Sequence, residues 1–70
     1  MNTILKGQIV TQYGSQIVFA TKAGIPENKL SYIIRGHREP TEREMLIFEK
    51  FLSVSREELF GEEVLFSDAP

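Results

Sequence analysis

The side chains able to perform chemistry in this 70-residue sequence are few in kind. There is one histidine, His37, and no cysteine, so neither a nucleophile–base pair nor a zinc site can be assembled. The ten acidic residues lie mostly at helix-capping or solvent-facing positions. We therefore expect no catalytic residue, no cofactor, no metal and no small-molecule ligand.

What remains is hydrogen bonding and charge. Glu27, Asn28 and Lys29 stand together at the start of an expected helix. Asparagine can pair bidentately with adenine, lysine can donate to guanine, and glutamate can accept from cytosine N4. The same three residues are also ordinary on any solvated helix, where Glu27 would complement the helix dipole.

The charge is divided unevenly along the chain, although the total is only −2. Residues 1–38 hold five basic residues against one acidic residue, a net charge of +4. Residues 39–70 hold three basic against nine acidic residues, a net charge of −6. A polyanion would be attracted to the first half and repelled by the second, although a solvated acidic pair of helices explains the pattern without any partner.

Length and composition predict one small soluble domain. A chain of this size buries only about 60% of the surface that its unfolded form exposes, so its core is small. The longest apolar runs, Ile17–Ala20 and Met45–Phe48, are far shorter than the roughly 20 residues of a membrane span. The beginning of the chain does not resemble a secretory signal, and the lack of cysteine fits a reduced compartment. We expect a cytoplasmic protein.

Closely spaced start and stop signals predict an all-α fold of five short helices. Glycines 14, 24 and 36 end helices, Ser15 is a plausible N-cap, Pro26 suits a first turn, and Thr41 with Glu44 forms a capping box. The expected helices are Thr3–Tyr13, Gln16–Ala23, Pro26–Arg35, a fourth from Thr41 to about Leu52, and a short fifth from Ser55 to Gly61. The expected core is Leu5, Ile9, Phe19, Ala20, Ile25, Leu30, Ile33, Met45, Phe48, Leu52, Val54 and Leu59.

Residues Gln16–Arg35 meet the demands of a helix-turn-helix. Two short helices crossing at about 90–120° need a small residue where their backbones approach, and Ala20 lies there. Gly24 supplies the positive φ of the turn. Ile25, Leu30 and Ile33 are spaced to line the inner face of the second helix. An ordinary helical hairpin is the alternative.

These residues resemble the lambda-repressor-like, Cro- and Xre-type helix-turn-helix regulators of bacteria and phages. The resemblance covers residues 3–61 and is carried by Ser15-Gln16, Phe19-Ala20, Gly24-Ile25, Leu30-Ser31, Ile33–Gly36, Pro40-Thr41, Val54-Ser55 and Glu58-Leu59-Phe60. It implies a DNA-binding domain over residues 1–61, followed by a tail at 62–70.

The resemblance also implies that Pro26–Arg35 lies in the major groove of double-stranded DNA as the recognition helix. By position, Glu27, Asn28 and Tyr32 would contact bases, and Lys29 a base or a phosphate. Contacts to the DNA backbone would come from Gln16, Arg35, His37 and Arg38, with Ser31 a further candidate. Tyr32 has the alternative of packing against the fourth helix.

The sequence departs from the family at three apolar residues. Ile17 and Val18 stand where the family commonly has charged residues, and Ile34 lies beyond the expected core face. These side chains would lie near the DNA surface, or would form a site for a partner protein.

A homodimer is expected because apolar residues exceed what the core requires. Ile47 and Phe51 would form a ridge on the fourth helix, and the tail adds Val64, Leu65 and Phe66. A two-fold dimer would match two operator half-sites about 34–36 Å apart. Alternatively, the tail residues fold back over the core.

Two functions therefore remain. The first is a sequence-specific transcriptional regulator of repressor type, which the basic first half favours. The second is a protein-interaction module, regulatory or antitoxin-like, that keeps the fold but binds DNA weakly or not at all. Ile17, Val18 and the acidic second half favour the second function.

Overall fold

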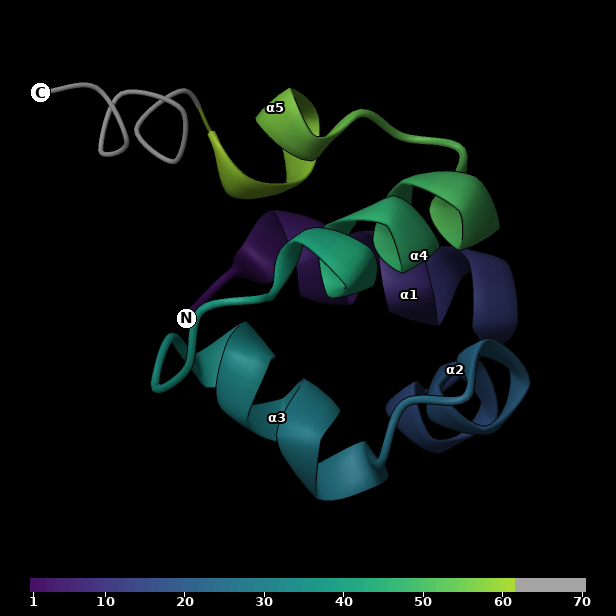
Figure 1. The fold of residues 1–70 in the computed structure, drawn as a ribbon. Coiled ribbons are helices and arrows are strands. Elements are labelled where there is room, and N and C mark those ends of the chain that lie inside the picture. The colour runs from purple at the N-terminus through teal and green to yellow at the C-terminus, as the bar shows by residue number, and fades with distance from the viewer. Residues whose placement is uncertain (62–70) are drawn as a thin grey trace, which may run out of the picture.

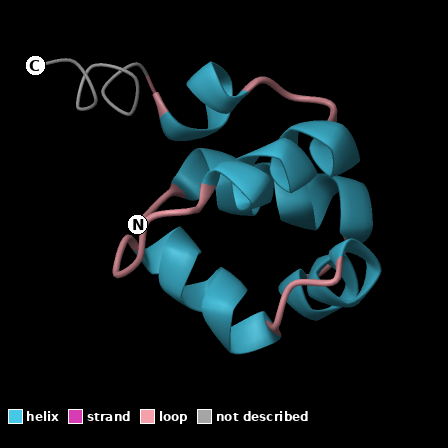
Figure 2. Cartoon of the chain, viewed as in Figure 1, coloured by secondary structure: helices cyan, strands magenta, loops and turns pink. Residues whose placement is uncertain are grey.

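The computed structural model describes residues 1–61, and in this range every regular element is a helix (Figure 2). The five helices run in the order α1 (Thr3–Tyr13), α2 (Gln16–Ala23), α3 (Glu27–Arg35), α4 (Glu42–Leu52) and α5 (Arg56–Phe60). The all-α fold of five short helices is thereby confirmed. The expected tail at 62–70, including Val64, Leu65 and Phe66, lies outside the described residues.

Local capping chemistry determines where most helices begin. The hydroxyl of Ser15 accepts a hydrogen bond from the Val18 amide at the start of α2, as expected. Thr41 and Glu44 form a complete capping box at the start of α4, so this prediction is also confirmed. Ser55 caps α5 through the amide of Glu58.

Helix α1 is the centre of the domain, because it contacts each of the other four helices. Figure 1 shows α2 and α3 on one side of α1 and α4, and α5 on the opposite side. The arrangement leaves the α2–α3 pair at one end of the molecule, away from α5. An interface built on α2 and α3 is therefore separate from the acidic α5.

An aromatic cluster fills the core. Phe19 is fully buried and its ring contacts three others, at centroid distances of 5.0 Å to Tyr13, 5.9 Å to Phe48 and 6.4 Å to Phe51. Such aromatic pairs add stability beyond their buried area. The side chain of Tyr13 also reaches α4, where its hydroxyl donates to the carbonyl of Phe51.

Three details of the expected packing are wrong. Pro26 is the N-cap of α3 and not its first helical residue, because its ψ of 137° is extended. Ile34 belongs to the core at 2% exposure, since it lies four residues after Leu30 on the inner face of α3; its carbonyl also accepts a hydrogen bond from the Asn2 amide. Met45 is only half-buried, because α4 is rotated so that Glu44 faces inward in its place.

The remaining expected core residues are buried, except that Val54 is partly buried against the cluster. In residues 1–61, no helix has the length and apolar character needed to cross a membrane.

Candidate nucleic-acid interface

The turn between α2 and α3 has the geometry that the sequence predicts. Gly24 adopts a left-handed conformation with φ 75° and ψ 27°. Its amide and that of Ile25 both donate to the Ala20 carbonyl, at 2.9 and 3.0 Å. Ala20 itself is buried at the point where the helices approach. The turn therefore provides hydrogen bonds to a backbone carbonyl in the last turn of α2 and redirects the chain within two residues.

The far end of α3 is fixed in a similar way. Gly36 is left-handed at φ 82°, and its amide donates to the Ile33 carbonyl while the His37 amide donates to that of Tyr32. This pair of bonds is a Schellman motif, which ends the helix after Arg35. Leu30, Ile33 and Ile34 bury the inner face of α3. The outer face is thereby held rigidly toward solvent.

The residues predicted to contact DNA lie on this outer face and around it. Tyr32 is 49% exposed, as a contact to DNA would need, and its alternative of packing against α4 stays a prediction. The other side chains fall into two groups by exposure. The exposed ones are Glu27, Asn28, Arg35 and His37, and the half-buried ones are Gln16, Lys29, Ser31 and Arg38.

Asn28 is partly engaged within its own helix. Its Oδ1 accepts a hydrogen bond of 2.9 Å from the amide of Lys29. The side-chain amide nitrogen keeps two donors, but a bidentate contact to adenine needs the oxygen as well. Because Oδ1 has a second lone pair, Asn28 can make this contact while it keeps the bond from the Lys29 amide.

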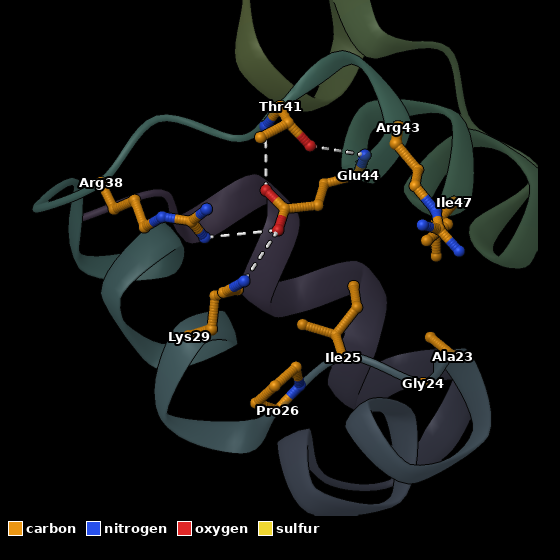
Figure 3. A pocket seen from close by; sticks show the side chains of 10 residues that line it. All are labelled: Ala23, Gly24, Ile25, Pro26, Lys29, Arg38, Thr41, Arg43, Glu44 and Ile47. Carbon is orange, nitrogen blue, oxygen red and sulfur yellow. Dashed lines mark hydrogen bonds and ion pairs between the residues drawn. The ribbon is translucent and has the colours of Figure 1, made fainter.

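One acidic residue, Glu44, lies close to both Lys29 and Arg38. The sequence indicated Glu44 only as a member of a capping box. The Glu44 carboxylate lies 3.3 Å from Nη1 of Arg38 and 3.9 Å from Nζ of Lys29 (Figure 3). These three side chains, from α3, the following loop and α4, line one cleft of about 470 Å³ together with Ile25 and others.

The surroundings of Glu44 keep it ionised. Its burial alone would raise the pKa of the carboxyl group. The Thr41 amide and the nearby charges of Arg38 and Lys29 act in the opposite direction and prevail, so the pKa of Glu44 is lowered from its ordinary value. The carboxylate is consequently a fixed negative charge beneath two of the expected DNA contacts.

A second ionic cluster joins α4 to α5. The guanidinium of Arg56 contacts Glu42 at 2.8 Å and Glu49 at 3.3 Å. Hydrogen bonds from Arg56 lower the pKa of both carboxyl groups. These bonds hold α5 against α4, although α5 is only five residues long.

Two of the three unexpected apolar residues do lie at the surface. Ile17 is 65% exposed and Val18 40% exposed, next to Gln16 in the first turn of α2. Ile17 and Val18 form an apolar step at the start of α2, the helix that precedes α3. Ile34, the third, is in the core and contributes nothing to this surface.

The residues expected at a dimer contact are less exposed than the sequence suggested. Ile47 and Phe51 are half-buried and pack against the core, and Leu46 is the exposed apolar residue of α4. A contact through Ile47 and Phe51 stays a prediction, as does the one through Val64, Leu65 and Phe66.

Within residues 1–61, no group of three or more potential ligand side chains is placed to hold a metal ion. The geometry is that of two crossed short helices with a rigid, polar outer face. This is the class of helix-turn-helix domains, in which the second helix enters the major groove.

Comparison with known proteins agrees with the geometry. A family model described as helix-turn-helix matches residues 11–59, well over half of the chain. The chain belongs to this Cro/C1-type helix-turn-helix family, a family of DNA-binding regulators that are typically not enzymes. No curated protein and no solved structure matches the chain significantly.

Proposed function

We propose that this protein is a sequence-specific transcriptional regulator of the repressor type found in bacteria and phages, acting in the cytoplasm and binding the major groove of double-stranded DNA with α3. The observation that carries the proposal is the rigid presentation of the outer face of α3. Glu27, Asn28 and Tyr32 are exposed there, while the inner face is buried. Base-edge contacts need this rigid placement, because each bidentate pair depends on geometry.

The charge distribution supports the same orientation. The outer surface of α3 and the loop after it carry Arg35, His37 and Arg38. Phosphate contacts from such residues position a protein on the duplex without specifying sequence. The acidic α5 lies on the opposite side of the molecule, so DNA would approach the α2–α3 side (Figure 1).

Selection of bound sequences from a random duplex pool tests the proposal. We expect a consensus site with wild-type protein. Asn28→Ala should relax the preference at one position of that site, whereas Arg35→Ala should weaken binding to all sequences about equally. Failure to enrich any sequence, together with the lack of a linear dependence of log affinity on log salt, would contradict DNA recognition.

A protein-interaction role is the second candidate, and the exposure of Ile17 and Val18 favours it. Apolar side chains at the start of α2 make no hydrogen bonds to phosphate. In this role the protein would bind DNA weakly or not at all, and a double substitution of Ile17 and Val18 by serine would abolish partner binding. The same double variant should retain most of its DNA affinity if the protein is a regulator.

A homodimer would complete the regulator. Two copies related by a two-fold axis would place two α3 helices in successive major grooves, about 34–36 Å apart. Selected sites should then be palindromic with half-sites one helical turn apart. Light scattering at micromolar concentration, with and without the selected duplex, measures the stoichiometry, and a monomer in both conditions contradicts the dimer.

A further inference from the structure

Glu44 lies beneath two of the cations that the proposed function offers to DNA. One of its oxygens, Oε1, accepts from the Thr41 amide at 2.9 Å. The other, Oε2, faces both Arg38 and Lys29. Figure 3 shows the side chains of Arg38 and Lys29 both directed at the carboxylate, with Thr41 beside it.

The carboxylate cannot easily move away. Glu44 is only 8% exposed, and the capping box fixes it from both sides, since its own amide donates to the Thr41 hydroxyl. The two cations that pair with Glu44 are more exposed than it is. The side chains of Lys29 and Arg38 are 41% and 34% exposed, so each can be reached from solvent. The anion is buried and fixed, whereas its partners are accessible.

A phosphate that contacts Lys29 or Arg38 must therefore approach a fixed negative charge. Two positive charges and one negative charge leave the cluster with a single net positive charge. The distances from the Glu44 carboxylate to its two cations are well inside the Debye length of about 10 Å at 0.1 M salt. Solvent ions therefore screen poorly the repulsion between Glu44 and a phosphate that contacts those cations. A protein cation that neutralises a phosphate releases counterions from the DNA. A cation that is already neutralised by an internal carboxylate releases fewer of them, so binding depends less steeply on salt.

We infer that Glu44 limits the affinity of this protein for DNA by competing with backbone phosphates for Lys29 and Arg38. The inference rests on the proposed function. It makes Glu44 a positioning residue that acts through these two side chains and does not itself contact DNA. The consequence is a protein that binds less tightly than its basic face allows, and whose weakest phosphate contacts lie at the α3–α4 corner.

The variant Glu44→Gln tests the competition. Glutamine is an accepted partner in a capping box, so the bond from the Thr41 amide is kept while the charge is removed. Affinity is measured by fluorescence anisotropy on a mixed-sequence duplex of about 20 base pairs, which spans two half-sites one turn apart. The matched control is Glu58→Gln, which removes one negative charge from an exposed site on α5.

Glu44→Gln should bind more tightly and depend more steeply on salt. Each added phosphate contact increases the slope of log affinity against log salt by about 0.9, so the advantage over wild type should fall roughly threefold per contact between about 50 and about 200 mM salt. Glu58→Gln should leave the slope unchanged. An unchanged slope in both variants overturns the inference, and so does weaker binding by Glu44→Gln.

A second measurement does not depend on the stability of that variant. In a protein that keeps Glu44, Lys29→Gln should change the salt slope by less than half as much as Arg35→Gln does. The reason is that Lys29 is paired with Glu44, whereas no ion pair of Arg35 is found within residues 1–61. Equal changes overturn the inference while leaving DNA binding intact. Absence of binding by wild type and Glu44→Gln alike contradicts the proposed function as well, so the two failures are distinguishable.

Discussion

The side-chain amide of Asn2 donates a hydrogen bond to the backbone carbonyl of Leu59, with Nδ2 and the oxygen 2.7 Å apart. This single residue joins the beginning of α1 to α5. Its Oδ1 also accepts from the Leu5 amide at 2.9 Å, and its backbone amide donates to the carbonyl of Ile34. Asn2 therefore connects three helices, two of which are distant from it in the sequence.

The first prediction follows from these bonds. Asn2→Ala removes an N-cap and an interhelical hydrogen bond, and should lower the free energy of unfolding by about 1–3 kcal/mol. Urea denaturation followed by circular dichroism measures the loss. Asn2→Asp is the control, because it keeps the acceptor for Leu5 but loses the donor to Leu59. It should fall between wild type and Asn2→Ala, and equal stability of all three proteins would contradict the role of Asn2.

The helices could be predicted from the sequence because their signals are local. Ser15, Gly24, Gly36 and Thr41 each act within a few residues of their own position, and each has its expected role. The faces of α2 were also predictable, since burial of Phe19 follows from spacing alone. Local chemistry therefore accounts for the order of the helices and for their bounds to within one residue.

What the sequence did not predict depends on contacts between distant residues. Ile34 shares the buried face of α3 with Leu30, four residues earlier, but the hydrogen bond that joins its carbonyl to the Asn2 amide is not revealed by any pattern within α3. The inward-facing Glu44 of α4 pairs with Lys29 and Arg38, which lie fifteen and six residues before it. The sequence therefore predicted which residues face solvent at the candidate site, but not that Glu44 lies beneath Lys29 and Arg38.

The second prediction concerns two glycines that differ in backbone conformation. Gly7 is exposed within α1, and a Cβ there meets no atom within 4 Å, so Gly7→Ala should raise the free energy of unfolding by about 1 kcal/mol. Gly24 has φ +75°, which strains any residue with a Cβ, so Gly24→Ala should lower the free energy of unfolding by about 1 kcal/mol or more. For a domain of this size a change of 1 kcal/mol moves the melting temperature by about 4–8 °C. Thermal melts in which the two variants shift in the same direction would contradict this account.

The third prediction is a dependence of stability on pH. The pKa of Glu44 in the folded protein lies below its ordinary value of 4.5. Its contribution to stability is therefore fully present above pH 4.5 and is lost as the pH falls below that value through the folded pKa. Glu42 and Glu49, whose pKa values Arg56 lowers, act in the same direction.

Glu44→Gln isolates the part that belongs to Glu44. The variant should be less stable than wild type near neutral pH, and the difference should close as wild-type Glu44 becomes protonated in acid. Urea denaturation between about pH 7 and about pH 3 measures this convergence. A difference that stays constant over the whole range would show that the charge of Glu44 does not stabilise the fold.

The fourth prediction separates the two faces of α2. Phe19 is fully buried among three aromatic rings, so Phe19→Ala should cost about 3–5 kcal/mol. A single small core rarely supplies more than about 3–5 kcal/mol, so this variant should be largely unfolded at room temperature. Ile17 lies two residues earlier on the same helix and is 65% exposed, and Ile17→Ala should change stability by no more than about 0.5 kcal/mol.

The pair of variants also distinguishes a structural from a binding role for the apolar step. Because Ile17→Ala keeps the fold, any change in its binding to DNA or to a partner protein comes from the surface itself. We expect circular dichroism and melting temperature to match wild type while binding is measured on the same sample. If Ile17→Ala loses as much helix as Phe19→Ala, then the start of α2 is packed and not exposed. In that case Ile17 and Val18 would support the core and would not form an interface.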